Sequence, residues 1–159
     1  MSTGKEPYPF NGIKRITIFI MSALYIIIGV KHFLNPDFFV AIVPPFITWE
    51  KEAVLLSGLF EIILGVLLLF GKTRRLASWC IIMLLIAVFP ANIYLYISEV
   101  PRETLNITQS QALFRMPFQI TLIIIAIWHS KHWKSRQMAK MSLGMFFVTM
   151  TYFLMIWNN

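Results

Sequence analysis

The sequence predicts an all-α protein, a polytopic bundle of transmembrane helices. Of its 159 residues, 58% are hydrophobic and only 13% are charged, whereas an ordinary soluble domain has about 45–50% apolar and about 25% charged residues. The apolar residues also gather in five long runs that are separated by charged residues, Gly, Pro or Asn. Runs of this length are typical of helices that cross a hydrocarbon layer about 30 Å thick. A water-soluble single domain is therefore excluded.

The first span is expected over residues 13–33, after an N-terminal tail of residues 1–12. The basic residues ahead of this run are typical of a signal peptide, but no small-residue cleavage motif follows, so we interpret the run as a retained span. The second span is expected over residues 53–70, and the third over residues 76–97.

The connection between the first two spans is unlike a simple turn. Residues 36–49 contain an apolar run followed by Pro44 and Pro45. A proline pair cannot continue a helix. We expect a short interfacial helix here that forms a lid over the outer mouth of the bundle.

The fourth span is expected over residues 114–129 and the fifth over residues 141–157, both near the lower length limit for crossing a bilayer. The sequence thus predicts a four-helix core over residues 13–130. A basic cytoplasmic loop over residues 131–140 then leads to a fifth helix within residues 141–159, which crosses the membrane or lies in its interface.

Basic residues alternate in density from one connection to the next. Basic side chains are enriched in cytoplasmic connections, so the N-terminus is predicted to be cytoplasmic in an integral protein of a bacterial cytoplasmic membrane. Because the basic residues stand at span ends, the net charge of +7 indicates contact with the lipid bilayer and not with nucleic acid. Ten basic residues fall on the predicted inner side: Lys5, Lys14, Arg15, Lys72, Arg74, Arg75, Lys131, Lys134, Arg136 and Lys140. Four fall on the other side: Lys31, Lys51, Arg102 and Arg115.

Glu61 is the candidate functional residue that stands out. It lies inside the second span, and an ionisable side chain in hydrocarbon is costly and faces the protein interior. Gly58 and Gly65 share its helix face, where small residues let a neighbouring helix approach closely. No catalytic residue can be assigned from the sequence, but Glu61 is a candidate proton relay.

Four further polar residues are expected to join Glu61 in one outward-facing, ligand-binding pocket: His32, Asn92, Arg115 and Gln119. The guanidinium of Arg115 could hold the Glu61 carboxylate in a bidentate ion pair. Asn92 follows Pro90, which is expected to kink the third span and free a carbonyl that Asn92 could satisfy. The alternative is structural, because a buried polar network can simply fix the register of the helices.

No metal site is expected. His129 and His132 are spaced as a pair at the inner end of the fourth span, but no acidic residue or cysteine lies nearby to complete a ligand set. A basic, tryptophan-rich collar that faces anionic lipid is the preferred interpretation of this region. The single Cys80 excludes both an intramolecular disulfide and a Cys-x-x-Cys redox pair.

Four short motifs resemble the DoxX-like family of small four-helix membrane proteins. They are GVKHFLNP at residues 29–36, SGLFEIILG at residues 57–65, FPAN at residues 89–92 and RMPFQ at residues 115–119. The resemblance implies a four-helix core, with the fifth helix as an addition.

The same resemblance implies a subunit of a redox-linked membrane complex that binds a quinone or another amphiphile without a covalently bound cofactor. In this interpretation Arg115 and Gln119 hydrogen-bond the ligand and Glu61 relays a proton. A membrane redox partner or a homo-oligomer is the expected partner. The rival hypothesis is a non-catalytic chaperone or interaction subunit, so the sequence leaves open whether the protein is an enzyme.

Overall fold

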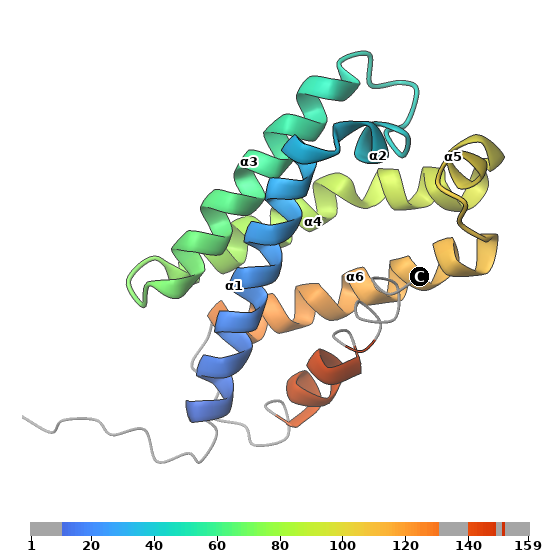
Figure 1. Ribbon diagram of the computed structural model, residues 1–159. Coiled ribbons are helices and arrows are strands. Elements are labelled where there is room, and N and C mark those ends of the chain that lie inside the picture. The colour runs from blue at the N-terminus through green and yellow to red at the C-terminus, as the bar shows by residue number, and fades with distance from the viewer. Residues whose placement is uncertain (1–10, 131–139, 149–150, 152–159) are drawn as a thin grey trace, which may run out of the picture.

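A computed structural model describes residues 11–130, 140–148 and 151. Over these residues the protein is all-α, without strands (Figure 1). The fold-class prediction is confirmed at that level. In chain order the helices are α1 (Asn11–Leu34), α2 (Pro36–Val40), α3 (Glu50–Leu69), α4 (Arg74–Ile97), α5 (Glu99–Thr104) and α6 (Gln109–Ser130).

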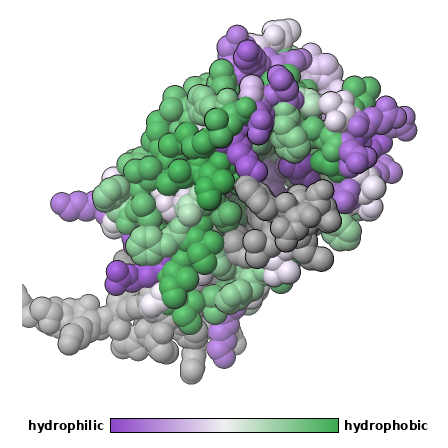
Figure 2. All heavy atoms as spheres, in the orientation of Figure 1, coloured by the Kyte–Doolittle hydropathy of each residue, from purple (hydrophilic) through white to green (hydrophobic). Residues whose placement is uncertain are grey.

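Four of these helices, α1, α3, α4 and α6, are long and apolar enough to cross a membrane. Hydrophobic residues form a broad band over the middle of the molecule, and hydrophilic residues gather toward its ends (Figure 2). Such a band is what a bilayer-spanning bundle presents to lipid. The chain is therefore a membrane protein with four candidate spans.

The fourth span is longer than its apolar run predicted, because α6 begins at Gln109 and not near residue 114. Two reciprocal hydrogen bonds fix this start: the Thr108 N–H donates to Oε1 of Gln111 (2.8 Å), and the Gln111 N–H donates to Oγ1 of Thr108 (3.3 Å). This capping box satisfies two donors of the first turn. As a consequence Pro117 lies inside the helix and not in its first turn.

The tightest helix pair is α1 with α3, and glycine makes it possible. A Cβ built on Gly29 would lie 2.6 Å from the carbonyl oxygen of Gly58, and one built on Gly58 would lie 2.5 Å from Cβ of His32. One on Gly65 would lie 3.0 Å from the carbonyl oxygen of Ser22, whose hydroxyl donates to the Gly65 carbonyl at 2.5 Å. The close approach predicted from Gly58 and Gly65 is confirmed.

The second close pair is α4 with α6, and the two pairs meet mainly where α3 packs on α4. Topology places α2 and α5 at one end of the bundle, the α2/α5 end. The α3–α4 turn lies at the opposite end, together with the start of α1 and the end of α6. We call that end the basic end, because Lys14, Arg15, Lys72, Arg74 and Arg75 lie there.

The shared hydrophobic core lies in the half of the bundle toward the basic end. Its members come from α1 up to Tyr25, the end of α3, the first half of α4 and the end of α6, together with Phe146. Toward the α2/α5 end the two helix pairs diverge (Figure 1). The core residues include Ile18, Met21, Tyr25, Leu64, Leu68, Ala77, Ile81, Ile82, Leu85, Ile125, Ala126 and Phe146.

The connection between α4 and α6 contains the short helix α5, which the sequence analysis did not predict. Nη1 of Arg102 donates to the carbonyl oxygens of Leu95 (3.3 Å) and Tyr96 (2.5 Å) at the end of α4. These bonds satisfy helix-terminal carbonyls that have no partner within α4, and so they favour an ordered turn.

The predicted fifth transmembrane helix is not shown. Residues 140–148 are helical, with Ser142 and Phe146 buried and Phe146 part of the shared core. The rest of the expected span lies outside the described residues, apart from residue 151. Most of the predicted N-terminal tail and most of the basic loop also lie outside them.

Candidate functional site

The side chains of Glu61, on α3, and His32, on α1, approach each other inside the bundle. Oε2 of Glu61 lies 3.4 Å from Nδ1 of His32, and only 14% of the Glu61 side chain and 8% of the His32 side chain are exposed. The local sequence brings them together, because Gly58 lies one turn before Glu61 and lets the backbone of α1 approach. The pair therefore occupies the closest helix contact in the bundle.

The pair is covered by the short helix α2. The ring of Phe39 stacks on the imidazole of His32, with 3.6 Å between the ring centroids and an angle of 19° between the planes. Nδ1 of His32 also lies 2.9 Å from the carbonyl oxygen of Ile28, one turn earlier in α1. The imidazole is thus held on one side by its own helix and on the other by an aromatic ring.

This site contains polar atoms without hydrogen-bond partners. Oε2 of Glu61 is buried without a hydrogen bond, since its approach to His32 does not have hydrogen-bond geometry. The hydroxyl of Tyr25 is buried without a partner as well, and it lies within electrostatic range of Glu61. Buried polar atoms in folded proteins are almost always paired, so unpaired ones require an explanation.

The sequence analysis missed Tyr25 and Phe39. Tyr25 could have been found from its spacing, because it precedes His32 by seven residues and so lies on the same helix face, together with Ser22 and Gly29. Phe39 carries no comparable signal, because its position over His32 depends on how α2 folds back after α1.

Asn92 and Gln119 form a second polar pair, between α4 and α6. Nδ2 of Asn92 donates to Oε1 of Gln119 at 2.7 Å, and Nε2 of Gln119 donates to the carbonyl oxygen of Leu85. It is therefore Gln119, and not Asn92, that reaches a backbone carbonyl near Pro90. The key polar atoms of this pair are satisfied by protein, which is typical of residues that hold transmembrane helices together.

The structure brings the five predicted site residues together in part: Glu61 lies beside His32, and Asn92 beside Gln119. The basic side chain beside the Glu61 carboxyl group is that of His32, and not that of Arg115 as expected. The reason is the order of packing: the glycine face that carries Glu61 is used by α1, whereas Arg115 lies on α6, which packs on α4. Arg115 is partly buried and has a contact of its own.

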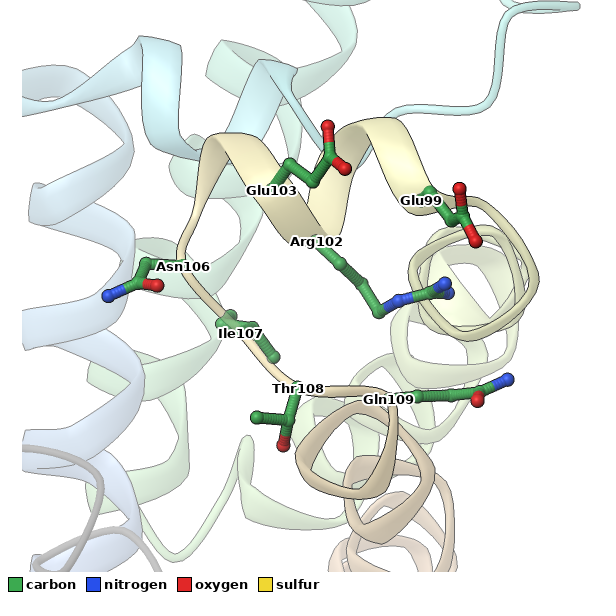
Figure 3. A pocket seen from close by; sticks show the side chains of 7 residues that line it. All are labelled: Glu99, Arg102, Glu103, Asn106, Ile107, Thr108 and Gln109. Carbon is green, nitrogen blue, oxygen red and sulfur yellow. The ribbon is translucent and has the colours of Figure 1, made fainter.

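A separate open pocket of about 340 Å³ lies at the junction of α5 and α6 (Figure 3). Arg102 and Gln109 extend toward the same side of it, and Glu103 points another way (Figure 3). Because Nη1 of Arg102 is bound to the end of α4, we assign this arginine a structural role. The lining residues are Glu99, Arg102, Glu103, Asn106, Ile107, Thr108 and Gln109.

At the basic end the structure differs from the expected interfacial collar. Trp128 is only 3% exposed and His129 only 4% exposed, so both pack inside the bundle. Their rings stack with centroids 5.5 Å apart. His132 lies outside the described residues, and within the described part of the chain no three His, Cys, Asp or Glu side chains gather as a metal site would require.

One family model matches the chain, over residues 21–130, and the family is described as a domain of unknown function (DUF8561). No curated protein matches, and no solved structure does. The resemblance to the DoxX-like family is therefore wrong. The four motifs that suggested it are short, and glycine faces, prolines and isolated polar residues recur in unrelated membrane helices.

Proposed function

The chain belongs to the family described as a domain of unknown function (DUF8561), and we propose that it binds the polar headgroup of a small amphiphile at Glu61. The supporting observation is a buried carboxylate with an unpaired oxygen inside a candidate membrane span. A carboxylate at such a depth is costly, and this cost is the reason such residues mark binding or proton-transfer sites.

The contrast between the two polar pairs supports a ligand at Glu61. Asn92 and Gln119 bind each other and the backbone, so they need nothing further. Glu61 and Tyr25 keep unpaired polar atoms. A headgroup whose oxygens accept hydrogen bonds from the Tyr25 hydroxyl and from a protonated Glu61 carboxyl group would satisfy both side chains, whereas a purely structural pair has no need to leave them unpaired.

The position of Glu61 suggests how an amphiphile would reach it. The two helix pairs diverge toward the α2/α5 end (Figure 1), and the shared core lies toward the basic end. An apolar tail could enter laterally between the pairs, with its headgroup directed at Glu61 and Phe39 moving aside. A quinone has this chemistry, because its carbonyl oxygens accept a hydrogen bond from a protonated carboxyl group, and Glu61 would then act as the proton relay.

The orientation belongs to the same proposal. At the basic end the described Lys and Arg residues have no described acidic residue beside them, whereas Lys31, Lys51 and Arg102 at the α2/α5 end are accompanied by acidic residues. Cytoplasmic connections are enriched in Lys and Arg. We place the basic end and the N-terminus in the cytoplasm of a bacterium, with Glu61 reached from the outer leaflet.

The test is a Glu61→Gln variant, which keeps the shape of the side chain and removes its acid function. We expect amphiphiles that co-purify with the wild-type protein, identified by mass spectrometry of lipids and quinones, to be lost from the variant. A short-chain quinone should raise the thermal unfolding temperature of the wild-type protein only. Glu103→Gln, at an exposed position, is the matched control and should behave like the wild type. Equal ligand stabilisation of the wild type and Glu61→Gln would refute the proposal.

A second candidate function is a non-catalytic interaction subunit. The satisfied Asn92–Gln119 pair and the glycine face of α3 favour it, because both serve helix packing alone. In that case Glu61→Gln should change the thermal stability of the protein in detergent, and no amphiphile should stabilise the wild type.

A further inference from the structure

Three helices converge at the basic end, around His129. Oγ1 of Thr17, on α1, lies 3.2 Å from Nε2 of His129, on α6. Nζ of Lys14 lies 5.9 Å from the ring centroid of Trp128, within the range of a cation–π contact. These contacts tie the start of α1 to the end of α6 beside the first turn of α4.

Positive charges are crowded at this junction. Arg74, in the first turn of α4, interacts repulsively with Arg15 on α1. Lys14 and Arg74 both act on His129. Arg74 cannot easily turn away, because Nε and Nη2 donate to the carbonyl oxygens of Leu68 (3.0 Å) and Leu69 (3.1 Å) at the end of α3.

No described acidic residue lies at this end to offset the charges. The described part of the chain places its carboxylates on α2, on α3 and on α5. They are Asp37, Glu50, Glu52, Glu61, Glu99 and Glu103. The repulsion between Arg15 and Arg74 is therefore not offset by a carboxylate of the described helices.

His129 supplies an independent observation. Its side chain is almost fully buried, and Nδ1 has no hydrogen-bond partner although Nε2 contacts Thr17. Among the described residues, the junction thus has no carboxylate beside its positive charges, and Nδ1 of His129 has no hydrogen-bond partner. A phosphate group supplies the negative charge, and a water molecule that it orders can donate a hydrogen bond to Nδ1.

We propose that this junction binds the phosphate of an anionic phospholipid, with Arg15 and Arg74 as its principal contacts. A lipid is the source, because the junction stands at the ends of candidate membrane spans, at the depth where headgroups lie. Exposed apolar side chains continue from it along the helices, Ile16 and Phe19 on α1 and Leu76 on α4. They offer a surface for the acyl chains, and the site is independent of Glu61.

The experiment compares Arg15→Gln with Arg75→Gln in the full-length protein. Both positions are exposed at the basic end and both changes remove one positive charge, but Arg15, on α1, lies within electrostatic range of Arg74 across the junction. The probes are phosphatidylglycerol, phosphatidylcholine and inorganic phosphate, added to protein in a neutral detergent. The rise in unfolding temperature measures how strongly each probe stabilises the protein, and native mass spectrometry counts the lipid molecules that stay bound.

We expect phosphatidylglycerol to stabilise the wild type and phosphatidylcholine to have little effect. Arg15→Gln should weaken the apparent affinity for phosphatidylglycerol about fivefold, whereas Arg75→Gln should leave it within about twofold. Equal weakening by both changes means general attraction of anionic lipid to a basic surface, and it overturns the proposal. So do an absent preference for phosphatidylglycerol and equal stabilisation by inorganic phosphate.

Discussion

At the scale of single residues, the close packing of α1 on α3 depends on glycines, which have no Cβ atom to keep the two backbones apart. Gly29 and Gly58 face each other, and a Cβ on either would overlap backbone or Cβ atoms that cannot rotate away. The same approach places Glu61 against His32. Packing and candidate site are therefore coupled at these positions.

We predict that Gly58→Ala lowers the stability of the detergent-solubilised protein by about 1–3 kcal/mol, the usual cost of overpacking. The added methyl group would lie 2.5 Å from Cβ of His32, so α1 and α3 must separate. Thermal unfolding measures the effect. Gly144→Ala is the control, because a Cβ there meets nothing within 4 Å. An unchanged unfolding temperature for Gly58→Ala would contradict the packing described above.

At the scale of helices, the apolar runs predicted the four spans because hydrocarbon requires long apolar helices whose backbone groups pair internally. The ends were predicted less well. The start of α6 is set by the capping box of Thr108 and Gln111. Because the first turn of α6 is polar, hydropathy alone does not show that the helix begins there. The existence of α5 depends on Arg102 binding the end of α4.

Helix neighbours were the part of the site that the sequence did not determine. Polar residues inside apolar runs are predicted to face the protein interior, and Glu61, His32, Asn92 and Gln119 are indeed buried or half-buried. The sequence does not show which helices pack against each other. The predicted partner of Glu61 is therefore Arg115, whereas in the structure the glycine face of α3 packs on α1 and places His32 beside Glu61.

For the α4–α6 pair we predict a measurable coupling between Asn92 and Gln119. A double-mutant cycle with Asn92→Ala and Gln119→Ala should give an interaction energy of about 0.6 kcal/mol and at most about 1.7 kcal/mol, the range of hydrogen bonds between membrane helices. Equilibrium unfolding in mixed micelles provides the four free energies. Additive effects of the two changes would argue against the 2.7 Å hydrogen bond between these side chains.

At the scale of the whole molecule, the orientation proposed from charge can be tested by cysteine labelling. Cys80 is the single cysteine, so Cys80→Ser gives a clean background. We expect a membrane-impermeant maleimide to label a Phe46→Cys variant in intact cells, because Phe46 is 75% exposed at the α2/α5 end. A Lys72→Cys variant, at the basic end, should react only after permeabilisation. The reverse pattern would invert the proposed topology.

The same labelling decides whether the predicted fifth span crosses the membrane. An Asn159→Cys variant should react in intact cells if residues 141–157 cross, and only after permeabilisation if the chain crosses four times. The crossing stays a prediction, because only residues 140–148 and 151 of this segment are described. The described helix packs Phe146 into the shared core.

The position of the shared core has a consequence for the lipid around the protein. The two helix pairs share a core toward the basic end and diverge toward the α2/α5 end (Figure 1), so in a bilayer the cross-section of the bundle would widen from one leaflet to the other. A wedge of this kind relieves bending stress where the wide leaflet is stretched. The protein should therefore concentrate on membrane that is convex on the side of its broad end.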